Sequence, residues 1–153
     1  MSTPPTEDPA QDPWEARLAA ARDRLAPALL LAGEWVGEGH AHGEPVTGRL
    51  RVRPILDGTA LEVWEQVGGH EDLCVYRYDA DNQQLEVVHL MPGALAIHPV
   101  ELTLDGLVWV TPPSQPTVVW TNRGTVGGTP VVDSEVVWPG QRIAEVKLTY
   151  RRV

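Results

Sequence analysis

Two histidines offer the clearest polar chemistry in this 153-residue sequence. His89 alternates with Leu85, Val87 and Met91, and His98 alternates with alanine, valine and leucine. Because successive side chains of a strand point to opposite faces, each histidine is expected on an apolar face. There an imidazole can anchor a ligand or act as a general base. It can equally be a core residue whose nitrogens are satisfied by neighbouring groups or water.

Tryptophan is the dominant aromatic residue, with six copies and no phenylalanine. Its broad face and single N–H donor suit the wall of a ligand cavity, although it also fills the interior of a small barrel. For the stretch 60–67 the sequence leaves open which face is inward, and the apolar face 61-63-65-67 would place Glu62 outside. The predicted ligand-binding residues are His89, His98, Trp64, Trp109, Trp120, Tyr76 and Arg123.

Signals for catalysis or metal binding are sparse. No G-x-S-x-G, P-loop or HExxH motif occurs, and the lone Cys74 excludes a disulfide within the chain. His40 and His42 share a strand face and could bind a metal with a third ligand, but a solvated strand end is the preferred interpretation. We therefore predict no catalytic residue and no metal ligand, and the sequence leans against an enzyme.

Charge and hydropathy limit the partners and the location. The formal net charge is −9, and a field of that sign repels phosphate backbones and anionic head groups. Nucleic-acid and membrane partners are therefore not expected. The sequence has neither the signature of a signal peptide nor an apolar run of roughly 18 residues. A cytoplasmic location is the resulting expectation.

One domain is expected over residues 12–153, preceded by a disordered tail over 1–11 that is rich in Pro, Thr and acidic residues. Asp12 is a candidate cap, Pro13 suits the first helical position, and Pro27 ends or kinks the helix. The helical spacing of four apolar residues predicts a stripe that faces the core. These residues are Trp14, Leu18, Ala21 and Leu25.

After residue 33 the apolar period changes to that of short strands separated by Gly, Pro, Asp and Asn. Strands are predicted near 34–42, 46–55, 59–67, 72–78, 84–91, 95–104, 107–111, 117–122, 131–138 and 142–151. About ten strands joined by hairpins, without helical crossovers, cannot form a parallel sheet. The pattern therefore predicts an all-β fold, an antiparallel up-and-down β-barrel with the helix capping one end.

Three motifs carry a resemblance to known barrels. They are Gly33-Glu-Trp35-Val-Gly37-Glu-Gly39, Arg53-Pro-Ile-Leu-Asp-Gly58 and Tyr76-Arg-Tyr78-Asp79. In this order they resemble nitrobindin-like and fatty-acid-binding-protein-like barrels of the calycin, or lipocalin-like, type, and most closely a bacterial group with G-x-W-x-G-x-G and RP-x-LDG motifs. Glycines on one strand face allow close backbone approach, and Trp35 is expected to pack against the helix and close one barrel end.

The resemblance also implies a haem, which nitrobindin-like barrels hold by a histidine on the last strand. Residues 142–152 contain no histidine, and Glu145 stands close to the expected ligand position. A carboxylate is a poor axial ligand for haem iron. We therefore expect the barrel without a haem cofactor.

The leading hypothesis is a binding protein that holds a small apolar or amphipathic molecule inside the barrel. One alternative is a nitrobindin-like haem protein, or an isomerase or hydrolase that uses the barrel histidines. Another is a filled structural barrel that acts as a homodimer.

Overall fold

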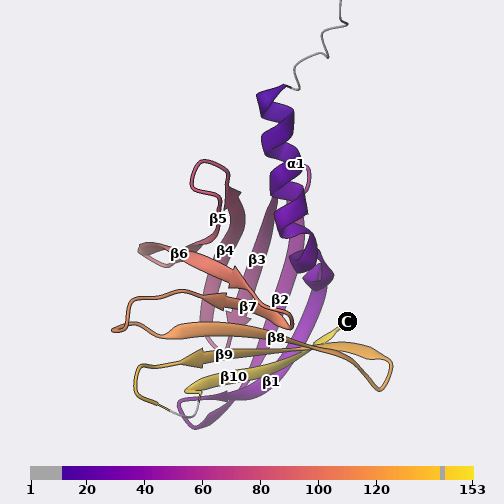
Figure 1. The fold of residues 1–153 in the computed structure, drawn as a ribbon. Helices are drawn as coiled ribbons and strands as arrows, with labels where there is room; N and C mark the ends of the chain where they lie inside the picture. Colours follow the sequence, from indigo (N-terminus) through magenta and orange to yellow (C-terminus); the bar gives the residue numbers. More distant parts are fainter. Residues whose placement is uncertain (1–11, 142–143) are drawn as a thin grey trace, which may run out of the picture.

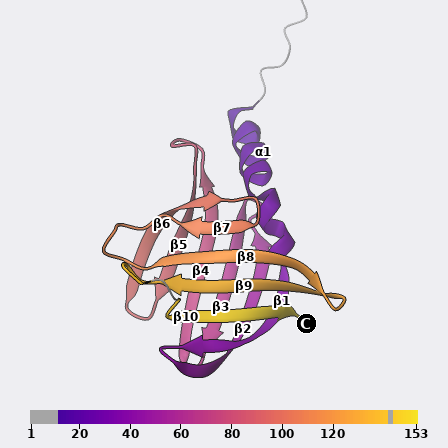
Figure 2. The ribbon, with the colours of Figure 1, turned by 60° about the horizontal axis from the view of Figure 1, so that its bottom comes forward.

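Within residues 12–141 and 144–153, which the computed structural model describes, ten antiparallel strands close into one barrel. Consecutive strands are neighbours in the sheet, and β1 pairs with β10 to complete the barrel (Figures 1 and 2). The elements are α1 (Pro13–Leu25), η1 (Ala26–Leu31), β1 (Gly33–Ala41), β2 (Glu44–Ile55), β3 (Ala60–Val67), β4 (His70–Asp79), β5 (Gln84–Met91), β6 (Ala94–Leu102), β7 (Gly106–Trp109), β8 (Thr117–Val126), β9 (Thr129–Val137) and β10 (Val146–Arg152).

The predicted up-and-down barrel is confirmed, and the strand boundaries differ mainly at two places. β8 continues to Val126 through a register shift between Asn122 and Thr125, where the alternation of the sequence is interrupted. β10 begins at Val146 rather than near residue 142. The predicted tail over 1–11 lies outside the described residues.

Helix α1 begins as predicted. Asp12 caps it by accepting a hydrogen bond from the Trp14 N–H at 3.0 Å, and Pro13 is the first helical residue. The 3₁₀ helix η1 follows directly from Leu25, and no helix in the described part of the chain is long and apolar enough to cross a membrane.

The apolar stripe predicted for α1 is correct only in its second half. Ala21 and Leu25 are buried, but Trp14 is 62% exposed. Figure 1 shows the reason, because the first turns of α1 project beyond the strands and have no sheet to pack against. The helix therefore covers the barrel end with its C-terminal turns.

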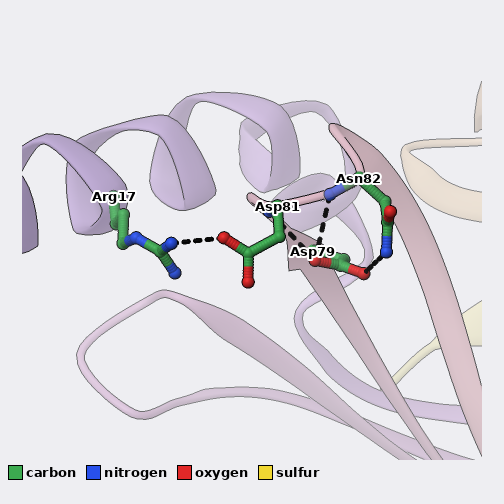
Figure 3. Close-up of polar contacts among 4 residues, drawn as sticks. All are labelled: Arg17, Asp79, Asp81 and Asn82. Carbon is green, nitrogen blue, oxygen red and sulfur yellow. Dashed lines mark hydrogen bonds and ion pairs between the residues drawn. The ribbon is translucent and has the colours of Figure 1, made fainter.

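Two ion pairs connect α1 to turns at the same end of the barrel. Arg17 pairs with Asp81 in the β4–β5 turn (Figure 3), and the Arg22 Nη2 atom lies 2.6 Å from Asp57 Oδ2. Asp79 organises the β4–β5 turn, since its carboxylate accepts hydrogen bonds from Asn82 Nδ2 at 2.7 Å and from the Asp81 N–H at 3.0 Å. Exposed ion pairs contribute little stability, so these contacts mainly orient the helix.

Trp35 closes the end of the barrel beneath the helix, as predicted. It is 2% exposed, and its indole N–H donates to the Leu31 carbonyl at 2.9 Å. The Arg152 guanidinium lies 4.8 Å from the centre of the Trp35 ring and donates to the Leu30 carbonyl. A cation stacked on an aromatic face and anchored to the backbone fixes η1 on the first and last strands.

The glycines of β1 make barrel closure possible. A Cβ atom on Gly39 would lie 1.8 Å from the Lys147 backbone oxygen, and one on Gly37 would lie 2.6 Å from the Tyr150 ring. On β2, a Cβ atom on Gly48 would lie 2.6 Å from the Tyr150 hydroxyl oxygen. These positions therefore let β1 approach β10 and leave room for the Tyr150 side chain.

We expect Gly39→Ala to reduce the free energy of unfolding by about 3 kcal/mol or more, because the new methyl group meets backbone rather than a movable side chain. Gly69→Ala is the matched control, since no atom of the described residues, apart from its chain neighbours, lies within 4 Å of the position that its new methyl group would occupy. Urea unfolding of the two variants measures the difference. Equal urea midpoints for both variants would contradict the proposed role of close backbone approach.

Candidate functional site: a cavity at the open end of the barrel

The barrel interior is packed at the helix end and hollow at the other. Near the helix the inward side chains Leu25, Leu61 and Val87 are fully buried. Towards the ends of the strands at the opposite side, the interior holds a cavity of about 840 Å³. Its mouth is formed by turn residues that include Gly68 and Pro116. The inward positions at this end alternate along the strands as barrel geometry requires.

Five of the seven predicted site residues line this cavity. They are His89, His98, Trp109, Trp120 and Tyr76. The inward orientation of both histidines therefore follows from the alternation of β5 and β6. The structure brings these five side chains together from five different strands.

Trp64 lies outside the cavity, contrary to the prediction. The inward face of β3 is 61-63-65-67, so Trp64 is on the outer face. There its N–H donates to Glu71 Oε1 at 2.6 Å, and the Arg51 guanidinium lies 5.4 Å from the centre of its ring. Glu62 is also outside, paired with Arg53 at 2.7 Å.

Arg123 also lies outside the cavity. Its Nε atom donates to Asp133 Oδ2 at 2.6 Å, and its side chain is 54% exposed. It occupies the stretch of β8 where the register shifts, so simple alternation from Trp120 does not extend to it. The partner Asp133 is buried on the outer face of β9 and also accepts from the Thr149 hydroxyl.

The aromatic wall of the cavity is centred on Trp109. His98 stacks on this ring with centroids 5.5 Å apart, and His89 meets it edge-on at 5.0 Å. The Trp109 N–H donates to the Tyr76 hydroxyl at 2.9 Å. Burial, together with the nearby His89, lowers the pKa of His98, so His98 is biased towards its neutral form.

Two carboxyl groups line the cavity beside the histidines. Glu65 on β3 is the register partner of Asp72 on β4. Glu65 Oε1 accepts a hydrogen bond from the Tyr150 hydroxyl at 2.6 Å. Asp72 Oδ2 lies 3.4 Å from His89 Nε2, and Asp72 Oδ1 lies 2.9 Å from His70 Nε2 without the alignment of a hydrogen bond. The cavity wall therefore combines a carboxyl pair with four histidines, of which His70 and His89 lie closest to Asp72.

The prediction from sequence missed this pair, although the sequence contains a signal for it. Glu65 is the single charged residue on the otherwise apolar face 61-63-65-67 of β3. A lone carboxyl group on an apolar strand face indicates a group that the fold buries, and buried carboxyl groups often serve a site.

The surroundings shift the two carboxyl groups in opposite directions. Burial raises the pKa of Glu65, the negative charge of Asp72 raises it further, and the Tyr150 hydrogen bond acts against both. Burial alone would raise the pKa of Asp72, but His89 and His70 outweigh it and the pKa is lowered. Asp72 is thus the more acidic of the two, and Glu65 retains its proton to a higher pH.

Cys74 also borders the cavity but is suited to packing. It is buried, and burial raises the pKa of its thiol. A thiol that resists deprotonation is a weak nucleophile, so Cys74 serves as a small core residue.

The described residues do not fit a haem held from the last strand. The inward side chains of β10 are Val146 and Leu148, which line the cavity, and Tyr150, which lies in the packed core with its hydroxyl bonded to Glu65. Glu145 lies before β10 and contacts His42 Nδ1 at 2.6 Å. Among residues 12–141 and 144–153, no three His, Cys, Asp or Glu side chains form a group that could hold a metal ion.

Comparison of the chain with protein-family models, curated proteins and solved structures gives no match. The likeness to nitrobindin-like and fatty-acid-binding-protein-like barrels therefore remains a prediction from three sequence motifs.

The raised pKa of Glu65 predicts a pH-dependent stability. Folded Glu65 holds its proton more tightly than unfolded Glu65, so its contribution is complete below the ordinary carboxyl pKa and is lost as the pH rises through the raised value. Glu65→Gln mimics the protonated form and can still accept from Tyr150. We expect the parent protein and the variant to have equal free energies of unfolding at about pH 4. Towards about pH 8 the variant should become the more stable of the two, by about 1.4 kcal/mol for each pH unit that separates the raised pKa from the ordinary one.

Urea unfolding across this pH range measures that advantage. Glu62→Gln makes the same change on the outer face of β3, where Glu62 pairs with Arg53, and should gain nothing as the pH rises. An advantage of Glu65→Gln that is independent of pH would refute the assignment.

Proposed function

We propose that this protein binds a small, largely apolar or amphipathic molecule in the barrel cavity. The observation that carries the proposal is the cavity itself, of about 840 Å³. Ligand sites in proteins typically range over about 300–1,000 Å³ and have apolar walls with a few polar groups. The hollow interior favours this proposal over a filled barrel with a purely structural role.

The polar atoms of the wall support the same proposal. The buried Trp120 Nε1 and Asp72 Oδ1 have no hydrogen-bond partner among the described residues. Buried polar groups are normally satisfied, and each exception calls for a reason. A site completed by a bound molecule or by water provides such a reason.

Acid–base catalysis in the same cavity is the second candidate. It is favoured by the carboxyl pair Glu65 and Asp72, whose surroundings shift their pKa values apart, and by the proximity of Asp72 to His89. Groups separated in this way can act as acid and base on one substrate. Mass spectrometry of a ligand recovered from the protein separates this candidate from simple binding, because catalysis returns an altered molecule.

Binding in the cavity is tested by filling it. Ala96 lines the cavity on β6, and the neighbouring Ile97 is 54% exposed on the outer face. We expect Ala96→Phe to weaken the binding of the neutral dye Nile red at least about tenfold, about 1.4 kcal/mol. Ile97→Phe should bind the dye as the parent protein does.

Dye fluorescence titration gives both dissociation constants, and urea unfolding checks that both variants are folded. Equal weakening by the two variants, or no weakening by Ala96→Phe, would count against a ligand site inside the barrel.

A further inference from the structure

We propose that the cavity selects molecules with an apolar body and an amine, and discriminates against carboxylates of the same size. This inference rests on the proposed function and specifies the class of ligand. It comes from the charges of the cavity wall, which carries two carboxyl groups and, among the described lining residues, neither lysine nor arginine.

The distribution of charge is the first argument. Glu65 and Asp72 line the cavity, and no lysine or arginine stands among the described lining residues. An anion that enters would lose its hydration beside two carboxyl groups, which is costly when no cation compensates. An ammonium group would enter a field of favourable sign.

The histidines of the wall do not change this balance. His42 contacts Glu145 at 2.6 Å, and both His70 and His89 face Asp72. Each of these three rings therefore faces a carboxyl group rather than standing alone in the cavity wall. Burial biases His98 towards the neutral form.

The second carboxyl oxygen of Glu65 can accept a hydrogen bond from a ligand. Its Oε1 atom accepts from Tyr150, whereas no hydrogen bond to Oε2 occurs among residues 12–141 and 144–153. The Tyr150 contact holds the carboxyl group in place. A bound ammonium favours the ionised form of Glu65 and so opposes the effect of burial on its pKa, which makes Oε2 an acceptor for the N–H donor. Hydrogen bonds between an ammonium and a carboxylate are among the stronger ones in proteins.

The aromatic residues support a cation in the same space. Trp109, Trp120 and Trp138 line the cavity, and indole faces are the best aromatic partners of ammonium groups. Aliphatic side chains that include Val63, Val118 and Leu148 line the rest and would contact the apolar body. The wall thus matches both parts of an amphipathic amine.

Three molecules of equal chain length test the selection. Decylamine, decanol and decanoate are titrated against the Nile red complex of the full chain near neutral pH, where the amine is a cation and the acid an anion. We expect decylamine to displace the dye at a concentration at least about tenfold lower than decanoate, with decanol between them.

Two variants assign the preference to Glu65. Glu65→Gln removes the charge and retains an acceptor for Tyr150. It should weaken the binding of decylamine at least about tenfold and change the binding of decanol by less than about threefold. Glu62→Gln removes a charge of the same kind from the outer face of β3 and should leave the binding of all three molecules unchanged.

The possible outcomes distinguish a failure of the amine preference from a failure of ligand binding in the cavity. Displacement by decanoate at or below the concentration of decylamine would overturn the amine preference while leaving cavity binding intact. An amine preference that survives in Glu65→Gln would overturn the assignment to this carboxyl group. Failure of all three molecules to displace the dye, with Ala96→Phe also without effect, would overturn the binding function and the inference with it.

Discussion

The hydrogen bond from Tyr150 to Glu65 is the constraint on which the interior depends. It joins β10 to β3 inside the barrel, across β1 and β2, where the paired glycines Gly37 and Gly48 leave the space that the tyrosine occupies. On the helix side of this contact Trp35 and its neighbours pack solidly, and on the other side the cavity begins. The glycine motif of β1 thus leaves room for the Tyr150 side chain and also allows the strand to curve.

The same contact determines the chemistry of the cavity. A carboxyl group in a largely apolar wall persists when a donor satisfies it, and Tyr150 is that donor for Glu65. Asp72 is held differently, between two histidines, and so keeps its charge more readily than Glu65 does. Neighbouring strands therefore present two carboxyl groups of unequal acidity to one space, a feature that a purely structural barrel does not need.

The sequence predicted the fold because its signals are local. Alternation and turn residues identified the strands, and the strongly apolar neighbours of His89 and His98 placed both rings inside. The inward face of β3 was harder to predict, because each of its two faces carries one acidic side chain. The choice of Trp64 as a site residue implied the face that the structure places outside. The Tyr150–Glu65 contact could not be predicted, because it joins residues 85 positions apart and depends on the register across four strands.

Closure between the first and the last strand has a consequence for folding during synthesis. Every other pairing joins consecutive strands, but β1 must wait for β10, which leaves the ribosome after the other strands. Until then the edges of β1 and β9 present unpaired backbone groups, and such edges are templates for association with other chains. A chain from which β10 has not yet emerged therefore cannot close the barrel, and any sheet that it forms leaves the edges of β1 and β9 open.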